Sequence, residues 1–351
     1  MVVPALAATP MAKGIHSPAL MPSLHDPVLA HTSGSYWLND ADSLLSKLLD
    51  TAEAVRLLIA QSNQQLILLP GDGDAVIEQM KSADGRRASA RGELGLAAPL
   101  PLTENWLFSL SGDGRLGGTF TYDPEDEARI RFAILTGGLS GAELESTVDA
   151  SGVVELDVTL QRSWQWQDWR AGLAVKAQHI ILHQRRIPLS EYEDDDLFDR
   201  GRDTREYQHG NVSLSLARDW GQWQWHSSIE DVIGRDFEGP LGDVYHLRPQ
   251  WRMGLARHTK WGLVSLESDL TARQGFDLVE DTQWHDLEWQ FQVHPKLDLA
   301  IGGRWVQKGE DDDSLKIAMD YHLPSDFHLG AFVRAAGSRQ LGAGVDVQFF
   351  F

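Results

Sequence analysis

The feature that most constrains the fold of this chain is a regular alternation of apolar and polar residues in its C-terminal half. In residues 286–293 every second residue is apolar, and the residues between them are acidic or carry an amide. Successive side chains of a β-strand point to opposite faces, so a period of two predicts strands with one apolar and one polar face. The alternation recurs in residues 297–305, 315–322, 327–333 and 341–351. We therefore expect strands and turns from about Arg91 to Phe351.

Composition leaves two classes of β protein open. The 351-residue chain has a mean hydropathy of −0.29 and no cysteine, which excludes disulfides and thiol chemistry. It has no apolar stretch close to the roughly 20 residues that a transmembrane helix needs. A transmembrane β-barrel has a similar average hydropathy, because every second residue faces its lumen. A soluble β-sandwich alternates in the same way.

The lengths of the connections favour the membrane barrel. Short connections (219–222, 257–261, 294–296 and 323–326) alternate with longer or more charged ones (185–206, 234–244, 272–282 and 308–314). Outer-membrane barrels have short turns at the periplasmic rim and long loops at the outer rim. The sequence thus predicts an all-β, antiparallel transmembrane barrel of about 14 strands.

The placement of tryptophan supports this interpretation. Seven of the 13 tryptophans flank three of the short turns, and we predict that they lie at the membrane interface. These are Trp164, Trp166, Trp169, Trp220, Trp223, Trp225 and Trp261. A stacking platform for bases or sugars is the alternative. The net charge of −20 disfavours nucleic acid as a partner.

The N-terminal quarter has a different pattern. Apolar residues recur at three- and four-residue spacing between Asn39 or Asp40 and Gln64, which predicts an amphipathic helix, and residues 75–82 suggest a second, shorter one. We therefore expect a leader with a candidate signal-peptide remnant (1–35), a helical segment (36–90) and a β-barrel (91–351). The helical segment is expected either as a plug in the lumen or on the periplasmic side.

No motif indicates catalysis, a cofactor or a metal. The run Gly112-Asp-Gly114-Arg-Leu-Gly117 matches a dinucleotide-binding pattern, but a strand-like sequence follows it, so we predict a hairpin turn there. His179 and His183 would lie about 13 Å apart along a strand, too far to share a metal ion. The acidic runs 191–196 and 310–313 fit solvated loops better than calcium sites. We predict that the protein is not an enzyme.

The polar faces of the C-terminal strands carry eight charged or titratable residues that we expect to face the lumen. They either line a water-filled pore or pair with one another and plug it. These residues are Asp286, Glu288, Asp298, Arg304, Lys316, Asp320, His322 and Arg334.

Several segments resemble the TraF-type conjugal-transfer barrel proteins of bacteria, which are related to the FadL-type outer-membrane transporters. The resemblance lies in residues 244–256 and 261–271, in the helical segment after Tyr36, and in Gly95-Leu-Ala-Ala-Pro99. Ser17-Pro-Ala-Leu20 is similar to an Asn-Pro-Ala-Leu element of that family, with Ser in place of Asn. The resemblance implies that Val347, Phe349 and Phe351 form the signal that the barrel assembly machinery reads.

Taken together, these patterns predict a barrel in the outer membrane of a Gram-negative bacterium. We expect a passive channel or transporter for a small, apolar solute. The alternative is a non-conducting scaffold or accessory of a conjugal transfer system, and a third class is a secreted β-sandwich that binds sugar. Expected partners are outer-membrane lipid, the assembly machinery and a small apolar ligand, with no nucleic acid and no cofactor.

Overall fold

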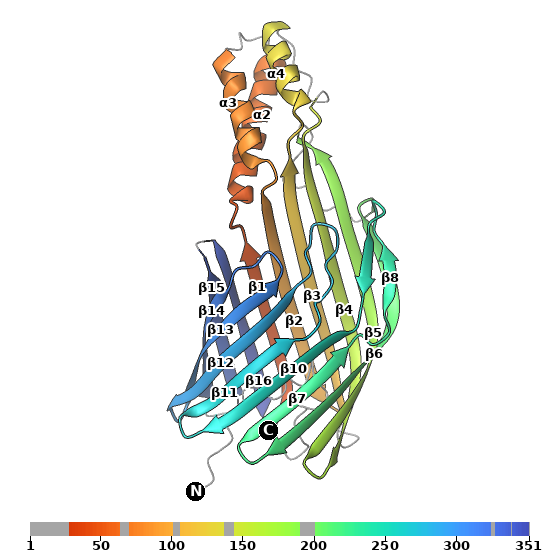
Figure 1. Cartoon of the computed structure of the whole chain (residues 1–351), viewed down its shortest axis with the longest axis vertical. Coiled ribbons are helices and arrows are strands. Elements are labelled where there is room, and N and C mark those ends of the chain that lie inside the picture. Colours follow the sequence, from red (N-terminus) through yellow and green to blue (C-terminus); the bar gives the residue numbers. More distant parts are fainter. Residues whose placement is uncertain are drawn as a thin grey trace.

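The computed structural model describes residues 28–63, 70–100, 106–136, 144–189, 201–323, 327–337 and 339–350. Fourteen of its strands are β1 (Val28–Asn39), β2 (Arg87–Pro99), β3 (Trp106–Thr121), β4 (Thr147–Trp166), β5 (Trp169–Pro188), β6 (Thr204–Trp220), β7 (Trp223–Glu230), β10 (Gln250–Thr259), β11 (Gly262–Asp269), β12 (Gln283–His294), β13 (Leu297–Lys308), β14 (Ser314–Leu323), β15 (Phe327–Ala336) and β16 (Gln340–Phe350). Within the described residues these 14 strands form one closed antiparallel barrel, in the order β1-β16-β15-β14-β13-β12-β11-β10-β7-β6-β5-β4-β3-β2 (Figure 1). This confirms the predicted fold class and the predicted number of strands.

The register of the strands gives the barrel wall two chemically different faces. Trp289, Ile301, Ile317 and Val333 lie in one row across β12 to β15, and their side chains are 42–67% exposed on the outside. The neighbouring residue Gln290 points the other way and is buried. The alternation in sequence therefore becomes an apolar outer surface around a polar lumen, as a barrel in lipid requires.

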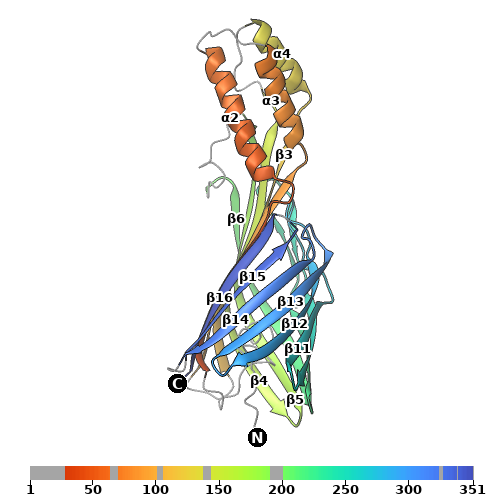
Figure 2. The same ribbon diagram turned by 90° about the vertical axis from the view of Figure 1, so that its left-hand side faces the viewer.

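The wall is much taller on one side than on the other. Strands β3 to β6 contain 16 to 20 residues, whereas β7 and β11 contain eight each. The tall strands rise beyond the rest of the barrel at the long-loop rim, and three helices stand above them (Figures 1 and 2). The helices are α2 (Leu44–Asn63), α3 (Pro70–Ala83) and α4 (Glu125–Thr136).

The helices share an apolar core with the upper ends of the tall strands. Leu48 and Val55 of α2, Met80 of α3 and Ile130 of α4 are buried together with Phe120 of β3. Burial of such side chains contributes roughly 1.5–3 kcal/mol each. None of the described helices has the length and apolar character needed to cross a membrane.

The structure corrects the predicted boundaries of the N-terminal segments. β1 lies within the expected leader and helical segment, yet it closes the barrel by pairing with β2 and β16. Its alternation is weak because Thr32 and Gly34 occupy outward positions, where apolar side chains would suit lipid. The helices lie neither in the lumen nor at the short-turn rim. The Trp37 indole N–H donates to Asp311, which places the end of β1 beside a long connection (2.9 Å).

Two further predictions in the barrel region are wrong. Helix α4 lies where strands alone were expected. Its first turn carries three acidic residues, which stabilise the start of a helix. The Asp123 carboxylate accepts a hydrogen bond from the Glu125 N–H at 2.8 Å. The glycine-rich run 112–117 lies inside β3 and is not a turn. A Cβ at Gly117 would be 2.8 Å from the carbonyl oxygen of Leu278, so this glycine permits close backbone packing.

A charge on the outer face tests the assignment of the two faces. Ile317→Arg places a cation in the outward row of β14 and is expected to cost about 2–4 kcal/mol in a bilayer. Gln290→Arg is the control, because it points into the lumen beside Glu288 and Asp298. Urea unfolding in lipid vesicles should show a much larger loss of stability for Ile317→Arg. Equal stability of the two variants would contradict the assignment.

Candidate functional site: the lumen and its long-loop mouth

The lumen contains a cavity of about 480 Å³. Among the described residues, ten carboxylates and six Lys or Arg side chains line it. They come from strands all round the barrel and from the loop that follows β11. The cavity is therefore polar, and its lining carries an excess of negative charge.

The eight residues that we expected to face the lumen all lie on β12 to β15. Four of them line the main cavity: Asp286, Arg304, Lys316 and Arg334. Three line a smaller cavity of about 100 Å³, which also includes Lys316: Glu288, Asp298 and Asp320. The eighth, His322, contacts Asp298 with 3.3 Å between its Nε2 and the carboxylate.

Most of these groups are paired with groups on adjacent or nearby strands. Arg304 donates through Nε and one terminal nitrogen to the two oxygens of Asp286, both at 2.8 Å, and Arg334 approaches the same carboxylate at 3.6 Å. Lys316 donates to Glu288 at 2.6 Å. The register explains both contacts. Asp286 is directly opposite Arg304, whereas Glu288 and Lys316 are both opposite Gly302, one on each side of β13. Bidentate pairing of this kind fixes both side chains on the wall.

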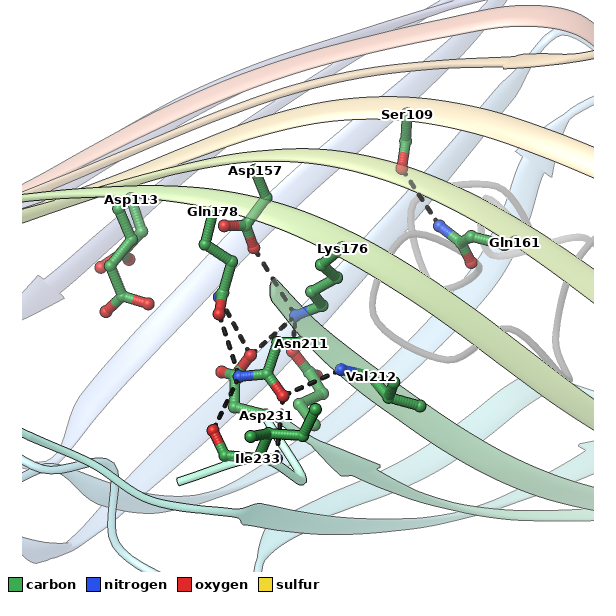
Figure 3. A network of polar contacts seen from close by, with 12 residues as sticks. Ser109, Asp113, Asp157, Gln161, Lys176, Gln178, Asn211, Val212, Asp231 and Ile233 are labelled. Atoms are coloured by element: carbon green, nitrogen blue, oxygen red, sulfur yellow. Dashed lines mark hydrogen bonds and ion pairs between the residues drawn. The ribbon is translucent and has the colours of Figure 1, made fainter. Parts of the chain in front are cut away.

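A second polar network covers the opposite wall (Figure 3). The Lys176 ammonium of β5 lies 3.3–3.6 Å from the carboxylates of Asp157, Glu230 and Asp231. Gln178 also donates to Asp231, at 3.1 Å. None of these four charged residues was among those predicted from sequence to face the lumen. The signal was present, since Lys176 and Gln178 alternate with apolar residues along β5.

The Lys176 network lies where the chain leaves the barrel wall at the end of β7. Asp231 has a positive φ of 52°, a conformation that is uncommon for residues other than glycine. Two residues later, the Asn211 side chain accepts from the Ile233 N–H at 2.9 Å, and the Val232 N–H donates to the Val212 carbonyl at 3.0 Å. The connection from β7 to β10 is thereby held against β6.

That connection contains a small hairpin, β8 (Arg235–Glu238) and β9 (Val244–Leu247), which covers part of the wall. Phe237 and Tyr245 of the hairpin are buried against Ile180 and Leu182 of β5. The inner face of β5 therefore changes from polar to apolar at the height where the hairpin covers it. The sequence predicted a longer connection in residues 234–244, and the buried aromatic residues explain why it is folded.

A second loop, residues 270–282, crosses the mouth, and we call it the strap. It leaves the barrel between β11 and β12 but contacts β3 and β4, and β4 is five places from β11 around the ring. The Ser151 hydroxyl of β4 accepts from the Leu278 N–H at 3.0 Å and donates to the Phe276 carbonyl at 3.2 Å. Phe276 is buried beside Tyr245, so the strap and the hairpin also contact each other.

The hairpin and the strap together cover the mouth, and we call them the covers. Five buried or partly buried side chains join them to the wall, and we call these the mouth cluster: Asp113, Arg115, Glu155, Tyr245 and Arg273. Glu155 accepts from Arg115 (2.9 Å), from the Tyr245 hydroxyl (2.9 Å) and from Arg273 of the strap (3.0 Å). Asp113 lies 3.1 Å from each arginine. Burial acts to lower the pKa of Arg273, but the two facing carboxylates outweigh it, so that this pKa lies well above its ordinary value. The arginine therefore stays charged and holds the strap.

The predicted interface tryptophans lie on both sides of the short turns. Trp166 pairs with Trp169 across the turn between β4 and β5, and Trp220 pairs with Trp223 across the turn between β6 and β7. Trp225 packs edge-on against Trp169, and Trp166 and Trp261 are 73% and 68% exposed. Cations lie over four of these rings at 4.7–5.3 Å, namely Trp164, Trp169, Trp223 and Trp261.

Some of the remaining predicted residues fall outside the described part of the chain. Phe351 and the acidic run 191–196 belong to this group, as do Ser17-Pro-Ala-Leu20 and most of the signal remnant. Phe349 of β16 is 39% exposed and packs edge-on against Phe327. In the second acidic run, Glu310 pairs with Arg87 and Asp311 with Trp37, so these carboxylates are separately bound.

The mouth cluster should contribute strongly to stability. Glu155→Ala leaves two arginines buried with one carboxylate fewer, and removing one partner of a buried ion pair costs about 3–5 kcal/mol. Urea unfolding followed by tryptophan fluorescence measures this loss of free energy of unfolding. Glu125→Ala is the control, because that side chain is 77% exposed. A loss no larger than that of the control would show that the cluster does not hold the covers.

Comparisons with known proteins identify the family. No curated protein matches the chain. Two similar solved structures are the deltaS2 and deltaS2S3 mutants of the TodX monoaromatic hydrocarbon channel, with TM-scores of 0.56 and 0.52 and 10% sequence identity each. They cover 97% and 96% of this chain, which covers 94% of each, and the likeness is one of fold. The sequence profile described as "F plasmid transfer operon, TraF, protein" matches residues 23–269, more than half of the chain. This chain therefore belongs to the TraF family.

Proposed function

We propose that the protein is an outer-membrane channel whose long-loop mouth is closed at rest by the hairpin and the strap. The observation that carries the proposal is the combination of an apolar outer wall with a polar, charge-lined cavity inside the same barrel. A barrel that only filled its interior to be stable would not need such a cavity. The mouth cluster supplies the closing contacts.

The proposed orientation follows from the two rims. The short turns and their tryptophans lie at one end, where half-buried indoles suit a membrane interface. The three helices, the hairpin and the strap lie at the other end (Figure 1). We therefore place the short turns in the periplasm and the helices outside the cell, as in outer-membrane barrels generally.

The charge of the lining favours a small polar solute, and a cation in particular. Carboxylates outnumber Lys and Arg by ten to six on the described cavity wall, and rings of carboxylates select cations in other channels. An apolar solute, expected from the family resemblance, is the second candidate. The shared fold with the TodX hydrocarbon channel structures favours it, whereas the charged lining does not.

The alternative function is a non-conducting scaffold or accessory of a conjugal transfer system. The family description, which names a plasmid transfer operon, favours it. So does the closed mouth, because a scaffold has no need of an open lumen. Conductance distinguishes the two functions directly.

Single-channel recording in planar bilayers tests the proposal with the strap released. Arg273→Ala removes the side chain that joins the strap to Asp113 and Glu155, and it should raise the open probability and reveal cation-selective reversal potentials. Arg131→Ala is the control, because Arg131 lies on α4, is 53% exposed and pairs with Asp74 and Glu127. The control should behave as the unchanged protein, which should open rarely. If Arg273→Ala shows no channel openings while circular dichroism shows an intact barrel, the scaffold function is favoured.

We also propose that the end of β16 is recognised by the barrel assembly machinery. Outward residues recur at every second position up to Val347 and Phe349, and Phe351 continues the pattern in sequence. Deleting Phe351 should sharply lower the amount in the outer-membrane fraction, while secretion across the inner membrane continues. An ordinary terminal residue contributes little, so normal outer-membrane levels of the truncated protein would contradict this role.

A further inference from the structure

A separate group of side chains gathers near the short-turn end of the lumen. It consists of Asp320 and His322 of β14 and His328 of β15. One ligand atom from each of these residues lies within 4.8 Å of the other two. None of the three belongs to the mouth cluster or to the Lys176 network.

The hairpin of β14 and β15 brings these residues together. His322 and His328 are directly opposite in the register, and their rings stack at 3.9 Å with 24° between the planes. Asp320 is two residues before His322 and therefore lies on the same face of β14. Asp298 of β13 is opposite Asp320, and its carboxylate lies 3.3 Å from the Nε2 of His322. The donors thus come from three adjacent strands.

Two carboxylate oxygens of this group, one each from Asp320 and Asp298, are buried and have no hydrogen-bond partner among the described residues. The Nε2 of His322 is also buried, and it lies 3.3 Å from the other oxygen of Asp298. A buried polar atom left without a partner is unfavourable, because it has lost its hydration and gained no hydrogen bond. Carboxylate oxygens and a neutral imidazole nitrogen are all electron-pair donors, so one bound cation would satisfy them together.

A glycine opens space for a further carboxylate beside the group. Gly330 of β15 is opposite both Asp320 and Asp346 of β16. The Asp346 carboxylate lies over Gly330, where a side chain on residue 330 would collide with it. The carboxylates of Asp298, Asp320 and Asp346 therefore lie at one level of the wall. The nearby cation Lys316 is bonded to a different carboxylate, that of Glu288.

We propose that Asp320, His322 and His328 bind a divalent metal ion of the zinc class, with Asp298 supporting His322 or joining the ligands. Two imidazoles and a carboxylate are a common zinc set, and imidazole favours zinc over magnesium or calcium. Zinc bonds of about 2.0–2.1 Å place tetrahedral ligand atoms about 3.4 Å apart, so small side-chain rotations close the 4.8 Å group around an ion. The ion would cross-link β13, β14 and β15 near the short turns.

This metal site departs from the expectation drawn from sequence, which included no metal. His322 and His328 are separated by five residues, a spacing that becomes a contact only when the chain between them forms a hairpin. The inference is independent of channel or scaffold function, because the ligands lie on the wall in either case.

Zinc titration of the full chain in detergent, after chelator treatment, tests the site by competition with a chromophoric zinc chelator. We expect one equivalent to bind to the unchanged protein, and the double variant His322→Gln/His328→Gln to lose that binding. His226→Gln is the matched control, a lumen histidine that faces one carboxylate, Glu267, at 2.9 Å and should leave zinc binding unchanged. Circular dichroism and heat-dependent gel migration confirm that each variant forms a barrel.

The pH dependence gives a second readout. Zinc binds the neutral imidazole and competes with protons for it, so the zinc affinity should fall on acidification. Absence of binding to the unchanged protein would overturn the proposal. Equal binding by the double variant would also overturn it, since this result would indicate an adventitious ion only. Loss of binding in His226→Gln alone would place the ion elsewhere in the lumen.

Discussion

The closure of the hydrogen-bonded ring between β1 and β16 is the contact on which the rest of the structure depends. Inside a bilayer, an unpaired backbone N–H or C=O has no water to bind and costs several kcal/mol. The register pairs β1 with β16 from Ala30 to Asn39 and with β2 on its other edge. No edge strand is then left in the described barrel. Once the ring is closed, the alternation of side chains decides which residues meet lipid and which meet the lumen.

The parts of the fold that follow from local pattern could be predicted from sequence. β12 to β16 alternate cleanly, and their two faces have the expected chemistry. β1 could not be predicted, because Thr32 and Gly34 stand at outward positions and the strand is recognised by its partners rather than by its pattern. α4 was missed for a related reason: its apolar face is short, and its packing against α3 and β3 is a long-range property.

The candidate sites also have a part that could be predicted from sequence and a part that could not. Sequence identified polar residues such as Asp286 and Arg304, but it could not give their pairing, which depends on the register between β12 and β13. The mouth cluster combines residues from β3, β4, the hairpin and the strap, up to 160 positions apart between Asp113 and Arg273. No local signal connects such residues. The paired arginines and carboxylates fix a single arrangement of loops that have little regular structure of their own.

The unequal height of the barrel wall determines how the mouth can be reached. The tall strands β3 to β5 and the helices above them form a screen along one side of the mouth, whereas the short strands β7 and β11 leave the other side low (Figure 1). In the proposed orientation, a molecule arriving at the cell surface would meet the strap from the low side, along the plane of the membrane, and not from directly above. Among the described residues the helices pack on the upper ends of the tall strands, whereas the strap is bound to the inner wall through Arg273 and Ser151.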